Sequence, residues 1–330
     1  MLRELKVSVE SWPLLVPFRI SRGVKTAAEV VVVEIVEAGV RARGEAVPYS
    51  RYGETTRTVV ETIQRMAGAI AAGASRADLE ELMPPGAARC AVDCALWDLS
   101  ARVSGVSVTA QLGQPSLPPL QSALTISLDT PQAMSEAASK LDDGGLIKIK
   151  VDASQPEAQV RAVREVLPEA RLIVDPNESW NLELLKSLAP TLQALRVDLL
   201  EQPLPADADE GLEGLNLPVP VCADESCHVS EDLPRLRRRY QAVNIKLEKT
   251  GGLTEALKLL ESAQAAGFTI MSGCMVSTSL DIVPAFHIAR HAAFVDLDGP
   301  ILLAQDRPGG VSFKDGQLLP PQAGFWGENA

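Results

Sequence analysis

The feature that most constrains the fold is an alternation of short apolar runs and amphipathic stretches across residues 116–303. Eight runs have the length and composition of strands, and helical apolar spacing follows most of them. These runs are LTISL, LIKIKV, RLIVD, VDLLEQP, PVCADES, AVNIKLE, FTIMSG and FVDLDG. Such alternation is typical of parallel strands joined by helical crossovers. Eight strands and about seven helices favour a closed (β/α) barrel that lacks one helix. The alternative, an open doubly wound sheet, has no glycine-rich phosphate fingerprint to support it.

The first part of the chain follows a different pattern. Residues 1–60 contain alternating and β-branched runs that predict strands, and residues 56–72 and 87–103 have the apolar spacing of helices. The stretches PFRISRGVKTAAE and AVPYSRYGETT lack periodicity and are expected to be polar loops. Glycine and proline are concentrated in Gln111–Pro119, which indicates a domain boundary. We therefore expect an α+β domain over residues 1–115, followed by a barrel domain over residues 116–303.

Charge and histidine content narrow the possible functions. The formal net charge is −12, so a basic face for nucleic acid is not expected. The chain contains three histidines, at positions 228, 287 and 291, which leaves little material for metal sites with several His ligands or for His-based proton relays. Catalysis by this chain would therefore depend on carboxylates and lysines.

The cysteines and the N-terminus indicate the compartment. An odd count of five cysteines in a chain of this size argues against a disulfide framework. The N-terminal segment alternates charged and apolar residues, unlike a signal peptide. No uncharged apolar window approaches the roughly 18 residues that a membrane span requires, so we expect a cytoplasmic protein with no membrane partner.

Acidic residues stand at the ends of three consecutive predicted strands. Asp175, Glu201 and Asp224 follow one another at intervals of 26 and 23 positions, about one strand–helix unit each. The C-terminal ends of barrel strands meet at the catalytic mouth, where three carboxylates would repel one another. A hard divalent cation relieves that repulsion, and oxygen ligands without His or Cys suit Mg²⁺, with Mn²⁺ as an alternative.

Three lysines accompany these acids. Lys148 and Lys150 are two positions apart on one strand and so face the same side, toward the barrel interior. We expect their proximity to lower a lysine pKa toward the range of a useful base. Lys246 ends a strand four places further round the ring. A lysine on each face of a substrate suits removal of a proton next to a carboxylate and its return from the opposite side, which is racemisation or epimerisation. A single base could still perform elimination or ring closure.

The motifs KIK, DPN, EQP, ADES and NIKLEKTGG, in this order, resemble the muconate-lactonising branch of the enolase superfamily over essentially the whole chain. The resemblance implies a modified TIM barrel, (β/α)₇β, with an α+β capping domain that residues 304–330 complete. It also implies Mg²⁺ on Asp175, Glu201 and Asp224, with Lys150 and Lys246 as the acid/base pair.

Further segments, among them PYSRYGE, GAARCAVDCALWDL, SGCMVSTS and VDLDGPILLA, resemble the dipeptide epimerases that interconvert L-Ala-L-Glu and L-Ala-D-Glu in murein peptide recycling. The resemblance implies that Asp296 and Asp298 bind the substrate's α-ammonium and that Thr125, Lys148 and Cys274 surround the substrate. Arg22 corresponds to the arginine that faces the substrate's Glu side-chain carboxylate. Arg51 and Tyr52 in the second polar loop would help to close a lid, and Glu248 is expected to pair with a neighbouring lysine.

Other functions stay open at this point. The same site could racemise N-acylamino acids, act on other dipeptides, or catalyse a cycloisomerase or o-succinylbenzoate synthase type of reaction. A barrel that binds a metal and a ligand without turnover is a further alternative. The expected partner is a small-molecule dipeptide, and a homo-oligomer is compatible with the sequence.

Overall fold

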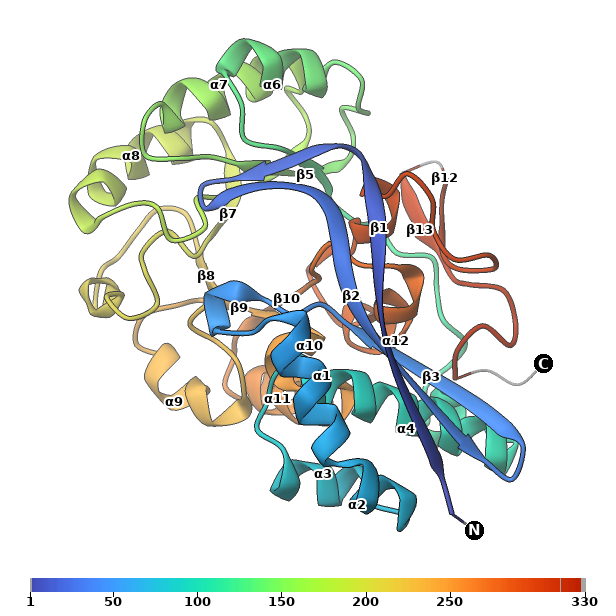
Figure 1. The fold of residues 1–330 in the computed structure, drawn as a ribbon. Helices are drawn as coiled ribbons and strands as arrows, with labels where there is room; N and C mark the ends of the chain where they lie inside the picture. Colours follow the sequence, from blue (N-terminus) through green and yellow to red (C-terminus); the bar gives the residue numbers. More distant parts are fainter. Residues whose placement is uncertain (1, 315, 328–330) are drawn as a thin grey trace.

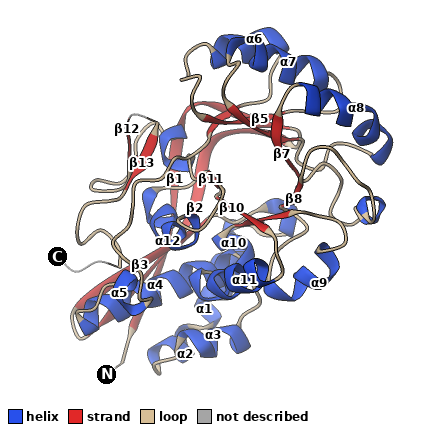
Figure 2. Cartoon of the chain, turned by 180° about the vertical axis from the view of Figure 1, so that it is seen from behind, coloured by secondary structure: helices blue, strands red, loops and turns tan. Residues whose placement is uncertain are grey.

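The structure is a computed structural model that describes residues 2–314 and 316–327. Its centre is an eight-stranded parallel sheet curled into a nearly closed barrel, with strands in the order in which they occur in the chain. The strands are β4 (Leu124–Ile126), β5 (Leu146–Lys150), β6 (Arg171–Asp175), β7 (Val197–Glu201), β8 (Val221–Ala223), β9 (Ala242–Ile245), β10 (Thr269–Gly273) and β11 (Phe294–Asp296). Figure 2 shows this ring of strands with helices outside it. The predicted (β/α)₇β barrel with an α+β cap is confirmed.

Helices occupy most of the crossovers between these strands. They are α6 (Pro131–Ala138), α7 (Pro156–Val166), α8 (Leu182–Ala194), α9 (Leu233–Leu236), α10 (Leu247–Thr250), α11 (Leu253–Ala265) and α12 (Ser279–Ala289). Between β7 and β8 the described chain forms η2 (Glu210–Leu212), a 3-10 turn, in place of an α-helix. Among the described residues, none of the helices combines the length and the apolar character needed to cross a bilayer.

The cap consists of an antiparallel sheet and a set of helices. Its strands are β1 (Glu4–Ile20), β2 (Gly23–Glu37) and β3 (Val40–Ala46), and β2 lies in the middle. Its helices are η1 (Ser50–Tyr52), α1 (Thr56–Arg65), α2 (Ala67–Ala71), α3 (Arg76–Leu82), α4 (Ala87–Ser104) and α5 (Val108–Gln111). Most of α4 is buried, and it packs against β2 and β3.

The C-terminal segment returns to the cap. After η4 (Gly299–Leu302) the chain forms the hairpin of β12 (Ser312–Lys314) and β13 (Gln317–Leu319). Ala304 N donates to Pro13 O at 2.8 Å, and Trp326 Nε1 donates to Cys94 O in α4 at 3.2 Å. These bonds attach the segment from Ala304 to Trp326 to the first domain.

The expectation of a polar loop between the first two strands was wrong. Both strands continue through that segment, with Phe18 opposite Lys25 and Ile20 opposite Gly23, so that Ser21 and Arg22 form a two-residue turn. Figure 1 shows this long hairpin, in blue, reaching across the ring of strands. Its tip is bonded to the barrel, because Leu128 N donates to Arg19 O and Ser21 Oγ donates to Asn177 O, both at 3.1 Å. Contacts that are distant in sequence therefore hold a segment whose local pattern does not predict a strand.

One apolar layer closes the interior of the barrel. It takes one buried side chain from each strand or from the residue before it: Ala123, Leu146, Ile173, Leu199, Cys222, Ala242, Met271 and Phe294. Such layers make the centre of a parallel barrel a packed core. Side chains two positions further along each strand must point inward above this layer.

The cap helix α4 holds the turn after β9. Arg89 Nη2 donates to Thr250 O at 2.6 Å, and Asp93 accepts a bond from Thr254 N at 3.0 Å. Between these contacts lies Gly252, with φ of +114°. The backbone there passes so close to α4 that a side chain cannot be accommodated.

We predict that Gly252→Ala lowers the free energy of unfolding by about 2–4 kcal/mol, from the combined cost of a strained backbone and of overpacking. A Cβ at this position would lie 2.5 Å from Asp93 Cβ. The matched control is Gly73→Ala, where φ is +97° and the new Cβ would meet nothing within 4 Å. Urea denaturation of both variants separates strain from overlap, and equal losses would contradict the proposed close contact.

We also predict a pH-dependent stability that comes from His287 in α12. This side chain is 1% exposed, its Nδ1 lies 2.9 Å from Gln114 Oε1, and burial lowers its pKa to about 3. As the pH falls below about 6.5, this imidazole binds a proton in the unfolded chain but stays neutral in the folded chain, so the free energy of unfolding decreases. Relative to His287→Gln, the wild type should lose about 2 kcal/mol between pH 7.5 and pH 5. Stability curves of the wild type and His287→Gln that run parallel between pH 7.5 and pH 5 would refute this prediction. The control is His291→Gln, which changes an exposed histidine.

Candidate active site

A polar layer lies directly above the apolar layer of the barrel. It consists of the residues two positions further along each strand: Thr125, Lys148, Asp175, Glu201, Asp224, Asn244, Gly273 and Asp296. Six of these eight are polar residues whose exposure is at most 5%. The predicted metal ligands, one predicted lysine and one predicted ammonium ligand therefore share a single level of the barrel.

Lys148 lies at the centre of this layer. Its Nζ is 2.6 Å from Glu201 Oε2, 2.8 Å from Asp296 Oδ2 and 3.1 Å from Asp175 Oδ2. The residue is 1% exposed. One ammonium thus balances part of the charge of three carboxylates in a region that excludes water.

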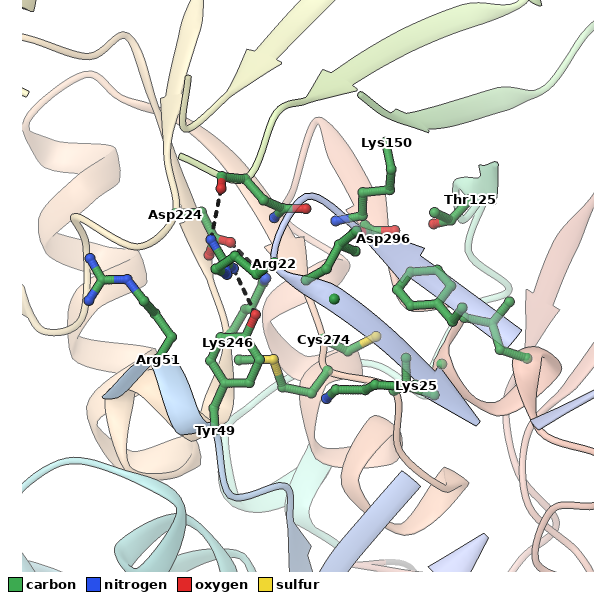
Figure 3. Close-up of a pocket in the computed structure, with 18 of the residues that line it drawn as sticks. Arg22, Lys25, Tyr49, Arg51, Thr125, Lys150, Asp224, Lys246, Cys274 and Asp296 are labelled. Atoms are coloured by element: carbon green, nitrogen blue, oxygen red, sulfur yellow. Dashed lines mark hydrogen bonds and ion pairs between the residues drawn. The ribbon is translucent and has the colours of Figure 1, made fainter. Parts of the chain in front are cut away.

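The two predicted acid/base lysines have one carboxylate partner each. Lys150 Nζ lies 2.6 Å from Asp175 Oδ2, and Lys246 Nζ lies 2.8 Å from Asp224 Oδ2. Lys150 ends β5 and Lys246 follows β9, four strands away in a ring of eight, so they enter the mouth from opposite sides. Figure 3 shows both side chains at the same pocket. This arrangement can present one amine to each face of a bound molecule.

The expected lowering of the lysine pKa was wrong for Lys148. Burial disfavours its charged form, but the charges of Asp296, Glu201 and Asp175 outweigh burial and raise its pKa well above the ordinary value. The pKa of Lys246 is raised in the same way, chiefly by Asp224 against the effect of burial. Repulsion between ammonium groups is the smaller effect because acids surround both lysines.

The carboxyl groups differ from one another. Burial opposes ionisation of Asp175, but Lys150 and Lys148 lower its pKa to about 2. Burial, with the charge of Asp175, raises the pKa of Glu201 to about 7. Glu201 is therefore the member of this group whose negative charge is least compensated.

The carboxylates of this polar layer are suitable donors for a divalent cation. In the part of the chain that the structure describes, no three His, Cys, Asp or Glu side chains already stand in the arrangement of a metal site. Lysine ammonium groups instead lie between the acids. Asp175, Glu201 and Asp224 are at most 1% exposed, and the buried Glu201 Oε2 makes no hydrogen bond within the described residues, although Lys148 is close. A donor set of carboxylate oxygens with an unbonded member fits Mg²⁺.

Sequence reasoning missed two residues that hold Asp224. Lys249 is 1% exposed, and its Nζ donates to Asp224 Oδ1 at 2.7 Å and to Asn244 O at 2.8 Å. Gln202 is fully buried, and its Oε1 accepts from the backbone N of Asp224 at 2.9 Å. Two sequence features could have revealed them: Lys249 follows Lys246 by three positions, and Gln202 places an amide directly after Glu201.

The expected pairing of Glu248 with a lysine was wrong. The described residues contain no such ion pair; Glu248 is 2% exposed and its carboxyl is hydrogen-bonded to that of Asp281 in α12. Burial is the main cause that raises the pKa of Glu248. A buried acid without a cation favours the protonated form.

Asp296 and Asp298 occupy the seam between the first and last barrel strands. Asp298 Oδ2 accepts from Thr125 N at 2.8 Å, and burial together with Asp296 raises its pKa to about 7. Asp296 Oδ1 is buried and has no hydrogen-bond partner among the described residues. Cys274 and Thr125 line the same pocket. Two buried acids with an unbonded oxygen form a site that suits a cation.

Arg22 lies at the tip of the hairpin, where it closes one side of the pocket. Its Nη2 is 2.7 Å from Glu225 Oε1 and 2.7 Å from Tyr49 Oη, and its Nη1 is 3.0 Å from Glu178 Oε2. Nearby, Arg51 donates two bonds to Glu178, at 2.6 and 2.7 Å. These bonds fasten the hairpin and η1 to the barrel over a cavity of about 470 Å³.

The comparisons with known proteins agree with this architecture. A family model described as Enolase C-terminal domain-like matches residues 133–325. A second, described as Mandelate racemase / muconate lactonizing enzyme, N-terminal domain, matches residues 2–113. The L-Ala-D/L-Glu epimerase of Escherichia coli (strain K12) is 44% identical over 96% of this chain and 99% of that protein. The N-acetyl-D-glutamate racemase of Pseudoalteromonas sp is also 44% identical, over 90% and 95%.

Solved structures that are similar to this chain include dipeptide epimerases. A crystal structure of an enolase family member from Agrobacterium tumefaciens with homology to dipeptide epimerases has a TM-score of 0.96 at 47% identity, covering 98% of this chain and 99% of that one. It contains sodium and L-Ala-L-Glu with an ordered loop. A dipeptide epimerase from Cytophaga hutchinsonii, complexed with Mg and D-Ala-L-Val, has a TM-score of 0.91 at 26% identity, covering 99% and 95%.

Proposed function

The chain belongs to the mandelate racemase / muconate lactonizing enzyme family of the enolase superfamily and is an isomerase, and we propose that it epimerises L-Ala-L-Glu and L-Ala-D-Glu at the Glu α-carbon. The observation that carries the proposal is the position of Lys150 and Lys246 on opposite sides of one buried mouth. We further propose, on the resemblance alone, a cytoplasmic role in murein peptide recycling.

The two lysines would move the proton. Lys150 takes the α-proton from one epimer, and Lys246 returns a proton on the opposite face; for the other epimer the two exchange roles. Lys148 provides a fixed positive charge for the negative charge that develops on the substrate carboxylate. Bound to Asp175, Glu201 and Asp224, Mg²⁺ or Mn²⁺ would supply further positive charge there. The hairpin and η1 cover one side of the pocket.

The acids at the seam support a dipeptide as the substrate. The unbonded Asp296 Oδ1 and the neighbouring Asp298 offer a binding site for the α-ammonium of an N-terminal residue. An N-acylamino acid has no such ammonium and would leave these acids without a partner. The identity to an N-acetyl-D-glutamate racemase nevertheless makes racemisation of N-acetylglutamate the second candidate.

We expect the wild type with Mg²⁺ to exchange the Glu α-proton of both epimers in D₂O, as followed by NMR. Lys150→Ala and Lys246→Ala should each lower epimerisation at least about 1,000-fold, because each removes one of the two acid/base groups. Either variant with full activity would refute the two-base mechanism.

Asp296→Asn and Asp298→Asn should each raise the dipeptide KM about 10- to 100-fold by loss of a charged hydrogen bond. If N-acetylglutamate is turned over instead and these variants leave its kinetics unchanged, the second candidate holds.

The metal ligands can be tested without turnover. We expect Mg²⁺ to raise the Tm of the wild type as its concentration increases, because it binds the folded state. Glu201→Gln and Asp224→Asn should weaken Mg²⁺ binding at least about 10-fold by calorimetry, since each removes a charged ligand. Glu183→Gln changes an exposed acid in the first turn of α8 and is the control. Unchanged affinity in Glu201→Gln would remove that residue from the ligand set.

A further inference from the structure

All but one of the cationic side chains around the cavity have carboxylate partners. Six cationic side chains line it: Arg22, Lys25, Arg51, Lys148, Lys150 and Lys246. Five of them have carboxylate partners within the protein, at 2.6 to 3.1 Å. Within the described residues no hydrogen bond or ion pair engages the sixth, Lys25. The cavity therefore contains one ammonium group that no carboxylate of the described residues contacts directly.

The surroundings of Lys25 disfavour an unpaired charge. The side chain comes from β2, is half-buried, and its Nζ lies 5.3 Å from the centre of the Tyr49 ring. Figure 3 shows it extending beneath Cys274 with its amine toward Tyr49. Burial is the main cause that lowers its pKa; the charge of Glu248 opposes this shift, and the smaller effects of Lys246 and Arg22 act with burial. A partly desolvated ammonium of this kind gains most from an incoming carboxylate.

Arg22 is less available than the resemblance implies. Both terminal nitrogens of its guanidinium already donate, Nη1 to Asn177 O and Glu178 and Nη2 to Tyr49 and Glu225. A substrate carboxylate at Arg22 would have to displace Glu225 or Glu178, which would leave a largely buried acid without its cation. Arg22 accordingly holds the hairpin tip on the barrel.

We propose that Lys25 determines specificity by binding the side-chain carboxylate of the residue that is epimerised, so that the enzyme selects an acidic residue at that position. This inference rests on the proposed function for the reaction itself. The substrate's charges then each have a partner: the α-carboxylate at the barrel lysines and the metal, the ammonium at Asp296 and Asp298, and the side-chain carboxylate at Lys25. N-acetylglutamate has the same side chain, so the assignment of Lys25 holds for both candidate substrates.

The test compares an acidic substrate with its neutral amide. For the wild type and for Lys25→Met, kcat/KM is measured with L-Ala-L-Glu and with L-Ala-L-Gln, which differ in charge and little in shape. We expect the Glu-to-Gln ratio to fall about 10- to 100-fold in Lys25→Met, mainly through KM for L-Ala-L-Glu, because the lost interaction is present in both ground and transition states. Lys25→Arg should restore most of the ratio.

Two further variants define the outcome. Lys186→Met changes an exposed lysine of α8 and should leave the ratio at the wild-type value. Arg22→Met should change the ratio less than Lys25→Met while lowering the Tm, because it removes the bonds between hairpin and barrel. A Glu-to-Gln ratio that Arg22→Met abolishes and Lys25→Met leaves intact would overturn the proposal.

Binding measurements separate this inference from the proposed reaction. Calorimetry gives the affinities of both variants and the wild type for L-Ala-L-Glu and L-Ala-L-Gln in the presence of Mg²⁺. If the wild type prefers L-Ala-L-Glu, loses that preference in Lys25→Met, and exchanges no α-proton, the reaction is wrong and the role of Lys25 stands. If exchange occurs and both ligands bind Lys25→Met with the wild-type preference, the reaction stands and the role of Lys25 is wrong.

Discussion

Charge balance in a dry barrel mouth is the constraint on which the rest of the structure depends. Five acids of the barrel mouth, Asp175, Glu201, Asp224, Asp296 and Asp298, are at most 5% exposed, and burial alone would oppose their ionisation. Lys148 contacts Asp175, Glu201 and Asp296 at once, and Lys150 adds a second contact to Asp175. Lys246 and Lys249 both contact Asp224. In the proposed reaction, a divalent cation held by these acids would leave the same lysines available to the substrate.

The cap contributes to the chemistry through backbone position as well as through coverage. Helix α4 binds the carbonyl of Thr250 and the backbone of Thr254, on either side of the glycine turn that follows Lys246 and Lys249. Those two lysines both contact Asp224. A helix of the first domain thus fixes the register in which a lysine and a carboxylate of the second domain meet.

The sequence predicted the barrel and its polar layer because both depend on a local period. Apolar residues such as Leu146 and Ile173 indicate which face of each strand points inward. Because side chains of a strand alternate between its two faces, Lys148 and Asp175, two positions later, point inward at one level. Properties that depend on neighbours in space were not accessible in this way. The hairpin around Arg22 is stabilised by a barrel loop more than 150 residues away, and the pKa of Lys148 depends on acids from three other strands. The role of Glu248 could not be read from its lysine neighbours in sequence, because its partner lies in another helix.

The seam of the barrel has a consequence for how the protein matures. β4 and β11 meet through Ala123 N and Val295 O at 2.7 Å, and through the bond from Thr125 N to Asp298. The acids proposed to hold the substrate's ammonium therefore stand where the earliest and latest barrel strands join. On the ribosome, the proposed metal ligands Asp175, Glu201 and Asp224 would leave the exit tunnel before this junction could form. The proposed binding site for the dipeptide's ammonium would accordingly be completed only when the first and last barrel strands pair.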